Sequence, residues 1–342
     1  MLRLGVSAFQ FYETRSHQEA WGYVGKALET MPDVAPILEA RALMFWAESL
    51  ASEIESDDVA EGKLRKILAL YDRSLALARP TGDPDTLVRV LCRMSYSMND
   101  ASDVDAARKL VEEAGSVARG AANPRLIGIA LMFEAWAKPF DDRKTLMLEA
   151  ANWLRRAGDS ATLCRALLVA SARSTATVDE VREDRALNAE ALQLADEIGY
   201  IRVKALLSGN LGIYCYVLGE RAEATAHLRR CVRMVYRGGW PEYWLSFPAW
   251  ALACLYADEG DYLGSAQLMG ANERLSREAP EFFLRNRRAG KGELSQSIED
   301  DVRRRSIENL GEEAYERVIA KGERLAKSQI VDLALGRSKA KT

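Results

Sequence analysis

The sequence predicts an all-α protein, and three observations support this fold class. The 342 residues are rich in Ala, Leu, Arg and Glu, which are strong helix formers, whereas Gly and Pro number only 23 and 9. Val, Ile and Thr are too scattered to build strands. In addition, one phrase occurs repeatedly: a small residue, then apolar residues, then a turn about eight residues after the start.

The repeated phrase divides the chain into similar units. It starts seven times, at intervals of 36 to 47 residues, at Ala27, Ser74, Ala114, Ala150, Ala191, Cys231 and Asn272. A second helical stretch follows each turn, and Pro84, Pro124 and Pro241 lie just past turns, where proline suits a helix start. A single helical hairpin cannot cover its own apolar face, so the sequence predicts seven stacked hairpins with these residues at equivalent positions on the second helices.

Two copies of the unit carry a more specific pattern. "NLGIYCYVLGERAEATAHLRRCV" resembles a tetratricopeptide repeat, with Leu211-Gly212 at the close helix contact and Gly219 at the turn. "WALACLYADEGDYLGSAQLMGAN" repeats it, with Gly260-Asp261-Tyr262 at the turn. The resemblance implies a right-handed α-α superhelix whose first helices line the concave side.

A narrower resemblance covers nearly the whole chain. The opening "LRLGVSAFQFYETRSHQEAWGYVGKALE" and the closing "LGEEAYERVIAKGERLAKSQIVDLAL" are similar to the two ends of the helical-repeat region in large bacterial ATP-binding (STAND-class) regulators of the LuxR and AfsR type. In that family a nucleotide-binding module precedes the repeats and a DNA-binding domain lies at one end. The resemblance implies that this chain corresponds to the sensor and interaction arm.

The end of the array needs a cap with a polar outside. Ala314, Tyr315, Val318 and Ile319 recur at helical spacing, with charged residues largely on the other side. We therefore expect a repeat array over residues 1–280 and a helical capping segment over residues 281–342, folded back on the seventh hairpin.

The sequence offers no catalytic, cofactor or metal motif. "GYVGKAL" and "AGKGEL" lack the spacing and the hydroxyl residue of a phosphate-binding loop, so we expect no tight ATP binding and no hydrolysis. His17 and His227 are the only histidines and are 210 residues apart, which does not suit a metal site. The adjacent acidic pairs fall near helix starts, where they favour the dipole. We expect neither an enzyme nor a cofactor.

Charge and composition also restrict the partners and the compartment. The net charge of −3 does not favour nucleic acid, and the Arg-rich stretches Arg285–Glu293 and Asp301–Leu310 are interpreted as solvated faces. The longest apolar run has 11 residues, too few to span a bilayer, and the N-terminus does not resemble a signal peptide. Five dispersed cysteines without a C-x-x-C pair predict a cytoplasmic protein with free buried thiols.

One stretch, "RGGWPEYWLSFPAW" (Arg237–Trp250), holds three of the seven tryptophans. Pro248 either interrupts a helix that starts at Pro241 or lies harmlessly in the first turn of a fresh helix near Ser246. The candidate site residues for a partner or effector are aromatic: Tyr216, Trp240, Trp244, Phe247 and Trp250. For Trp250 alone, packing in the core is the favoured interpretation.

The expected function is therefore that of a non-enzymatic helical-repeat interaction or sensor module in a bacterial signalling or transcriptional regulator. It would bind a protein partner or effector on its concave face. A small-molecule sensor with an enclosed ligand groove and a stand-alone tetratricopeptide scaffold remain alternatives.

Overall fold

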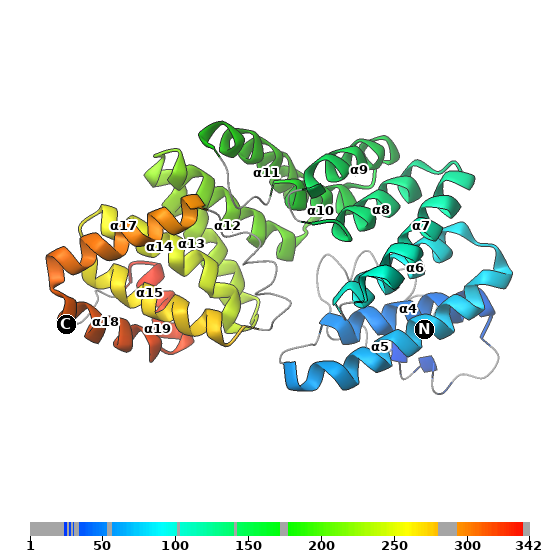
Figure 1. Ribbon diagram of the computed structural model, residues 1–342, viewed down its shortest axis with the longest axis horizontal. Helices are drawn as coiled ribbons and strands as arrows, with labels where there is room; N and C mark the ends of the chain where they lie inside the picture. Colours follow the sequence, from blue (N-terminus) through cyan, green and yellow to red (C-terminus); the bar gives the residue numbers. More distant parts are fainter. Residues whose placement is uncertain are drawn as a thin grey trace. The chain divides into compact units, whose positions relative to one another are not determined.

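The computed structural model describes residues 24–25, 27–28, 30, 34–52, 57–100, 103–139, 142–171, 177–279 and 293–337. These residues contain fifteen α-helices, two 3-10 helices and no β-strand, which confirms the all-α prediction (Figure 1). The first helices are α4 (Pro36–Ser52), α5 (Asp57–Ala78), α6 (Pro84–Asp100), α7 (Val104–Gly120), α8 (Pro124–Trp136), α9 (Arg143–Ala157), α10 (Ser160–Ala170) and α11 (Val178–Ile198). They are followed by α12 (Ile201–Val217), α13 (Arg221–Arg237), α14 (Ser246–Asp258), α15 (Tyr262–Arg277), α17 (Glu293–Leu310), α18 (Glu312–Glu323) and α19 (Lys327–Ala334). The 3-10 helices are η1 (Arg79–Thr81) and η3 (Glu242–Leu245).

Consecutive helices pair as hairpins. The pairs α4/α5, α6/α7, α8/α9, α12/α13 and α14/α15 each pack along their length. Six of the seven predicted register residues lie on the later helix of a pair or on α11, and all six are buried: Ser74, Ala114, Ala150, Ala191, Cys231 and Asn272. The seventh, Ala27, is helical and half-buried. The repeat of about 40 residues in the sequence thus corresponds to small buried residues that recur on successive helices.

Glycine allows the two helices of a hairpin to approach closely. A Cβ at Gly212 on α12 would lie 2.5 Å from Cγ of Leu228 on α13, and a Cβ at Gly128 on α8 would lie 2.7 Å from Cγ of Leu154 on α9. Both distances are far below van der Waals contact, so only glycine fits. The helix contact predicted at Leu211-Gly212 is confirmed.

The chain divides into two compact units. One comprises Met1–Ala170 with Leu194–Tyr200, and the other comprises Ser171–Gln193 with Ile201–Thr342. No described helix is long and apolar enough to cross a membrane.

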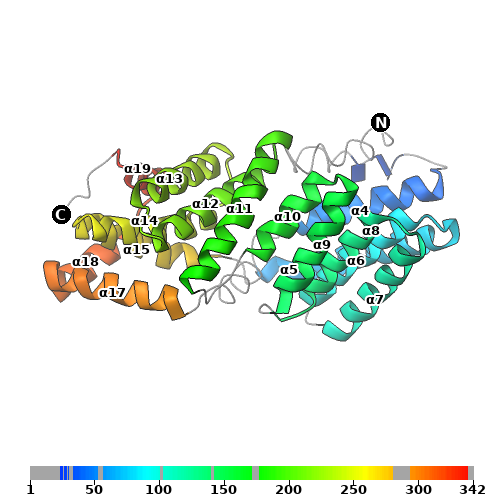
Figure 2. The same cartoon turned by 90° about the horizontal axis from the view of Figure 1, so that it is seen from above.

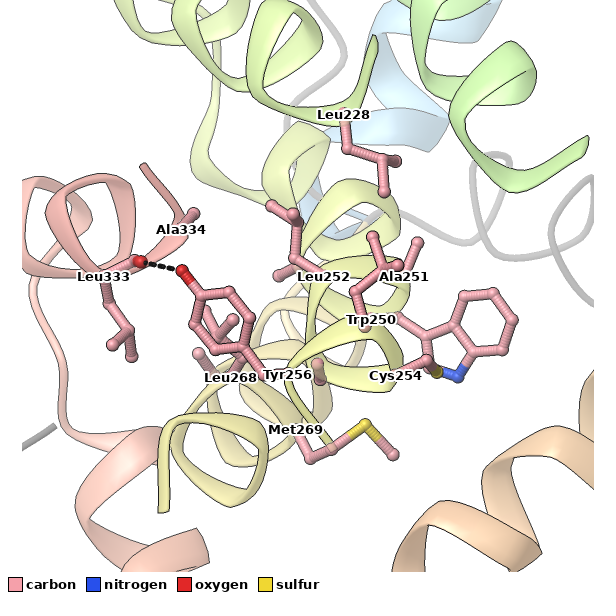
Figure 3. Close-up of a cluster of buried hydrophobic side chains, with 14 of the residues drawn as sticks. Leu228, Trp250, Ala251, Leu252, Cys254, Tyr256, Leu268, Met269, Leu333 and Ala334 are labelled. Carbon is pink, nitrogen blue, oxygen red and sulfur yellow. Dashed lines mark hydrogen bonds between the residues drawn. The ribbon is translucent and has the colours of Figure 1, made fainter. Parts of the chain in front are cut away.

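The described part of the C-terminal segment, residues 293–337, packs on the last hairpin of the second unit, as the sequence predicts. Figures 1 and 2 show α17 and α18 beside α15. Tyr315, Val318 and Ile319 are buried and Ala314 is half-buried, whereas the charged residues on the opposite side of α18 are exposed. The C-terminal helix α19 is held by the Tyr256 hydroxyl, which donates to the carbonyl oxygen of Leu333 at 2.7 Å (Figure 3). The described C-terminal helices thus form part of the core of the second unit.

Candidate functional site

The five aromatic residues proposed from the sequence all lie in the second unit, in three different settings. Trp240 precedes η3 and Trp244 lies within it, Phe247 and Trp250 lie on α14, and Tyr216 lies near the end of α12.

Trp240 and Trp244 are half-buried and pack against the core of the second unit. Their ring centroids are 5.8 Å apart, and the ring of Trp244 also stacks on Tyr243 at 6.2 Å. The guanidinium of Arg202 lies 5.2 Å from the Trp244 ring centroid. The Lys327 ammonium donates to the carbonyl oxygen of Trp240 at 2.5 Å. The rings of Trp240 and Trp244 therefore anchor the turn after α13 to the core, and part of the surface of each ring remains accessible to solvent.

Trp250 and Pro248 belong to the buried start of α14. This helix begins at Ser246, directly after η3, so Pro248 lies in its first turn and interrupts no helix. Of the two alternatives for Pro248, the structure therefore shows the one in which a new helix starts near Ser246. Only 6% of Trp250 is exposed, and Figure 3 shows its indole beside Cys254. The core interpretation of Trp250 is confirmed. Phe247 is half-buried, and its ring would lie 3.4 Å from a Cβ at Gly209.

Tyr216 lies near an ion pair between Asp258 and Arg305, an arginine of the C-terminal segment. Burial, with Cys254 and Asp258 contributing, raises the pKa of its hydroxyl. Asp258 is bound by Arg221 at 2.8 Å and by Arg305 of α17 at 2.9 Å. Helix α17 packs on α14 as well as α15. Part of the surface near Tyr216, one of the candidate site residues, is therefore covered by the chain itself.

A different site lies in the first unit, between residues of helices α4, α6, α8 and α10. A pocket with a cavity volume of about 20 Å³ is lined from α4, α6, α8 and α10. Its lining residues are Met44, Glu48, Arg89, Arg93, Arg125, Ile129, Phe133, Thr162 and Arg165. Four arginines therefore face one small space with a single glutamate among the lining residues. We name it the arginine pocket.

A repeated sequence motif builds the polar side of the arginine pocket. Residues 82–89 are GDPDTLVR and residues 158–165 are GDSATLCR, so each fits the pattern G-D-x-x-T-L-x-R. In both copies glycine ends the preceding segment in the left-handed conformation, with φ of 64° at Gly82 and 68° at Gly158. The final arginines, Arg89 and Arg165, are the sixth residues of α6 and α10 and both line the pocket.

The aspartate of each motif is a helix cap that also binds an arginine of an earlier first helix. Asp159 accepts from the backbone N–H of Thr162 at 3.0 Å, from its hydroxyl at 2.9 Å, and from Nε of Arg125 at 2.7 Å. Burial opposes ionisation of Asp159, but the bonds from Arg125 and Thr162 outweigh it and hold its pKa below the usual range. Arg125 is thereby fixed at the pocket wall.

The equivalent set at α6 has the same chemistry. Asp83 accepts from the backbone N–H of Thr86 at 3.0 Å and from Arg41 of α4 at 2.9 Å. Burial again raises the pKa of Asp83, and the bonds from Thr86 and Arg41 lower it further than burial raises it. In the first unit, the motif therefore makes the same kind of link in two places. It connects α4 to the start of α6, and α8 to the start of α10.

Two other pocket arginines, Arg93 and Arg89, are also held by acids. Nε of Arg93 lies 2.8 Å from Glu48, and the Arg93 guanidinium lies 5.5 Å from the Phe133 ring centroid. Nε of Arg89 lies 3.1 Å from Asp85. Such pairs fix the direction of a guanidinium while it keeps further donors, since each has five N–H groups.

Within the part of the chain that the structure describes, one group of side chains could in principle hold a metal ion. Cys215, Glu220 and Glu223 have ligand atoms within 4.8 Å of one another. However, the Arg185 guanidinium binds Glu220 at 2.7 Å and Glu223 at 3.1 Å. One guanidinium of the protein thus already binds both carboxylates, and the arrangement is explained as an ion-pair cluster.

Comparison of the chain with protein families and with curated proteins gives no match. The arginine pocket was not found by sequence reasoning, which followed the density of aromatic residues. The sequence signal for the pocket is the repeated G-D-x-x-T-L-x-R pattern, because its two copies place arginines at equivalent positions of α6 and α10.

Proposed function

We propose that this chain is a non-enzymatic helical-repeat interaction module that binds a protein partner through the arginine pocket and the first-helix face around it. The observation that carries the proposal is the convergence of Arg89, Arg93, Arg125 and Arg165 from three helices on one small space. By its resemblance to the repeat region of LuxR- and AfsR-type regulators, the module would belong to a bacterial signalling or transcriptional regulator in the cytoplasm.

The size of the arginine pocket favours a protein partner over an enclosed small-molecule ligand. A cavity of roughly 10–15 Å³ holds one water molecule. The observed volume of about 20 Å³ accommodates one small group of a ligand, such as the end of a side chain. A sensor that encloses its effector needs a cavity of roughly 300 Å³ or more. A stand-alone scaffold would use the same face.

The ion pairs of the α17 arginines do not favour nucleic-acid binding. Arg303 lies 3.4 Å from Glu316, Arg304 binds Glu308 at 2.9 Å, and Arg305 binds Asp258 at 2.9 Å. Arginines engaged with carboxylates of the same chain contribute less to counterion release on a phosphate backbone.

The buried thiols support the non-enzymatic part of the proposal. Burial raises the pKa of Cys92 and of Cys231 to about 12. At neutral pH these thiols are therefore protonated and are poor nucleophiles.

Site-specific photocrosslinking in cells of the source organism tests the proposal. A benzophenone amino acid would replace Tyr96, a half-buried residue of α6 whose ring lies 6.4 Å from that of Phe133. Parallel replacements are made at two other positions. The replacement at Trp244 tests the aromatic stretch. The replacement at Tyr236, which is 44% exposed on α13, tests a face formed by the second helix of a hairpin. The proposal predicts one partner band whose yield is highest at Tyr96. A highest yield at Trp244 would move the site to the aromatic stretch, and equal yields at all three positions would contradict a defined face.

A further inference from the structure

The arginine pocket has a charge and a shape that define the chemistry of its ligand. Its polar lining carries four guanidinium groups and one carboxylate. The carboxylates of Asp85 and Asp159 contact Arg89 and Arg125 at hydrogen-bond distance through Nε. The lining is therefore cationic toward the cavity, and the geometry of the cations is set before a ligand arrives.

Arg89 and Arg125 keep donors for a ligand. Arg89 uses its Nε on Asp85, and Arg125 uses its Nε on Asp159, while Nη1 of Arg125 lies 3.7 Å from Asp85, beyond hydrogen-bond distance. The side chains are 17% and 29% exposed, so the remaining N–H groups face solvent in part. A planar carboxylate accepts two parallel N–H donors from a guanidinium.

The rest of the wall is apolar. Met44 and Ile129 are buried, and Phe133 lies beneath the Arg93 guanidinium. An apolar wall strengthens a charge pair by lowering the local dielectric constant. It also suits the methylene groups that precede a side-chain carboxylate.

We propose that the arginine pocket binds a glutamate or aspartate carboxylate from an acidic segment of the partner protein. The proposal rests on the proposed function and adds the chemistry of the partner. The small cavity fits one carboxylate, and the other arginines of the lining select neighbouring acidic residues of the same segment.

Fluorescence anisotropy with the full chain and a labelled octaglutamate peptide tests this inference. We expect saturable binding that weakens as salt is added, because exposed charge pairs are screened. Unlabelled octaglutamate should compete, whereas octaglutamine should not. Acetate and inorganic phosphate at equal total charge should compete poorly, since they lack the neighbouring carboxylates.

Matched variants locate the binding. Arg89→Gln with Arg93→Gln should weaken octaglutamate binding at least about tenfold, because charge-assisted hydrogen bonds are lost. The control pair, Arg108→Gln with Arg119→Gln, removes two exposed arginines of α7 and should change the affinity less than about twofold. If the control pair weakens binding as much as the pocket pair, or if octaglutamine binds equally well, the inference is wrong.

A second variant covers the case in which Arg93→Gln unfolds the chain by leaving Glu48 unpaired. Ile129→Glu keeps every arginine and supplies a carboxylate inside the pocket, so it should abolish octaglutamate binding, while Ile129→Gln should retain it. Undiminished binding by Ile129→Glu would overturn the inference. If octaglutamate does not bind but the Tyr96 crosslink still captures a partner, the inference fails and the proposed function stands. If Tyr96 captures no partner, the proposed function fails.

Discussion

Gly270 of α15 and Ile319 of α18 are in backbone contact: a Cβ at Gly270 would overlap the carbonyl oxygen of Ile319. The contact is reciprocal, because a Cβ at Gly322 of α18 would overlap the carbonyl oxygen of Gln267 of α15. The two helices thus cross with glycine on each side, and α18 docks on α15 at this point.

Gly270→Ala should destabilise the protein by about 3 kcal/mol, at the upper end of the cost of overpacking, because a backbone oxygen cannot move aside as a flexible side chain can. Urea denaturation measures this cost. Gly62→Ala on α5 is the matched control: nothing lies within 4 Å of its added Cβ, and it should stabilise by about 0.5–1 kcal/mol. Equal effects of the two substitutions would contradict the close crossing.

Deletion of the chain from Gly311 onward should lower the melting temperature and promote aggregation. The deletion removes Tyr315, Val318 and Ile319 from the core and exposes the surface of α15 that they cover. Thermal denaturation followed by circular dichroism, with light scattering for aggregation, measures both effects. An unchanged melting temperature would show that the segment is a free tail or a partner-binding element.

Trp240→Ala and Trp244→Ala should each cost about 2 kcal/mol in the free energy of unfolding. A fully buried tryptophan costs about 3–5 kcal/mol, and both rings are only half-buried. Chemical denaturation of each variant provides the measurement. A loss under about 1 kcal/mol would mean that the rings are free to contact a partner, as the sequence first suggested. A loss of 3 kcal/mol or more would leave the stretch as a joint only.

The helical fold could be predicted because its signals are local or periodic. Small residues such as Ala114 and Ala150 recur at the crowded point of each hairpin, and glycines such as Gly158 end helices in the left-handed conformation. The packing of residues after Gly311 also followed from one amphipathic pattern. These features depend on neighbours within one or two turns of a helix.

The arginine pocket could not be predicted in the same way, because its members come from four helices spread over more than a hundred residues. On a single helix, Arg93 or Arg125 has the pattern of an ordinary surface residue. Likewise, the ion pair between Asp258 and Arg305 joins residues 47 positions apart, so the sequence did not indicate that α17 covers the face near Tyr216.

Asp159→Asn should destabilise the protein by about 2 kcal/mol at pH 7, because the variant loses the charge-assisted bond from Arg125 to a carboxylate that is 4% exposed. The folded pKa of Asp159 is below its usual value, so its stabilisation is present above the unfolded pKa and is lost as the pH falls through the folded pKa. The difference between wild type and variant should therefore disappear in acid. Asp105→Asn, at an 83% exposed side chain paired with Arg108, should cost less than about 0.5 kcal/mol and serves as the control.

The proposal requires arginines of the first unit that are already arranged to receive a carboxylate, and the stability difference between Ile129→Glu and Ile129→Gln tests this arrangement without any partner. We predict that Ile129→Glu is more stable than Ile129→Gln by about 1–2 kcal/mol at pH 7, since only the glutamate forms charge-assisted bonds. The arginines should lower the folded pKa of the new carboxyl below its unfolded value of about 4.3, so the advantage should persist above that pH and vanish as the pH falls through the folded pKa. Urea denaturation of both variants from pH 7 to pH 3 measures the difference. Equal stability at pH 7, or a less stable glutamate variant, would contradict the claim.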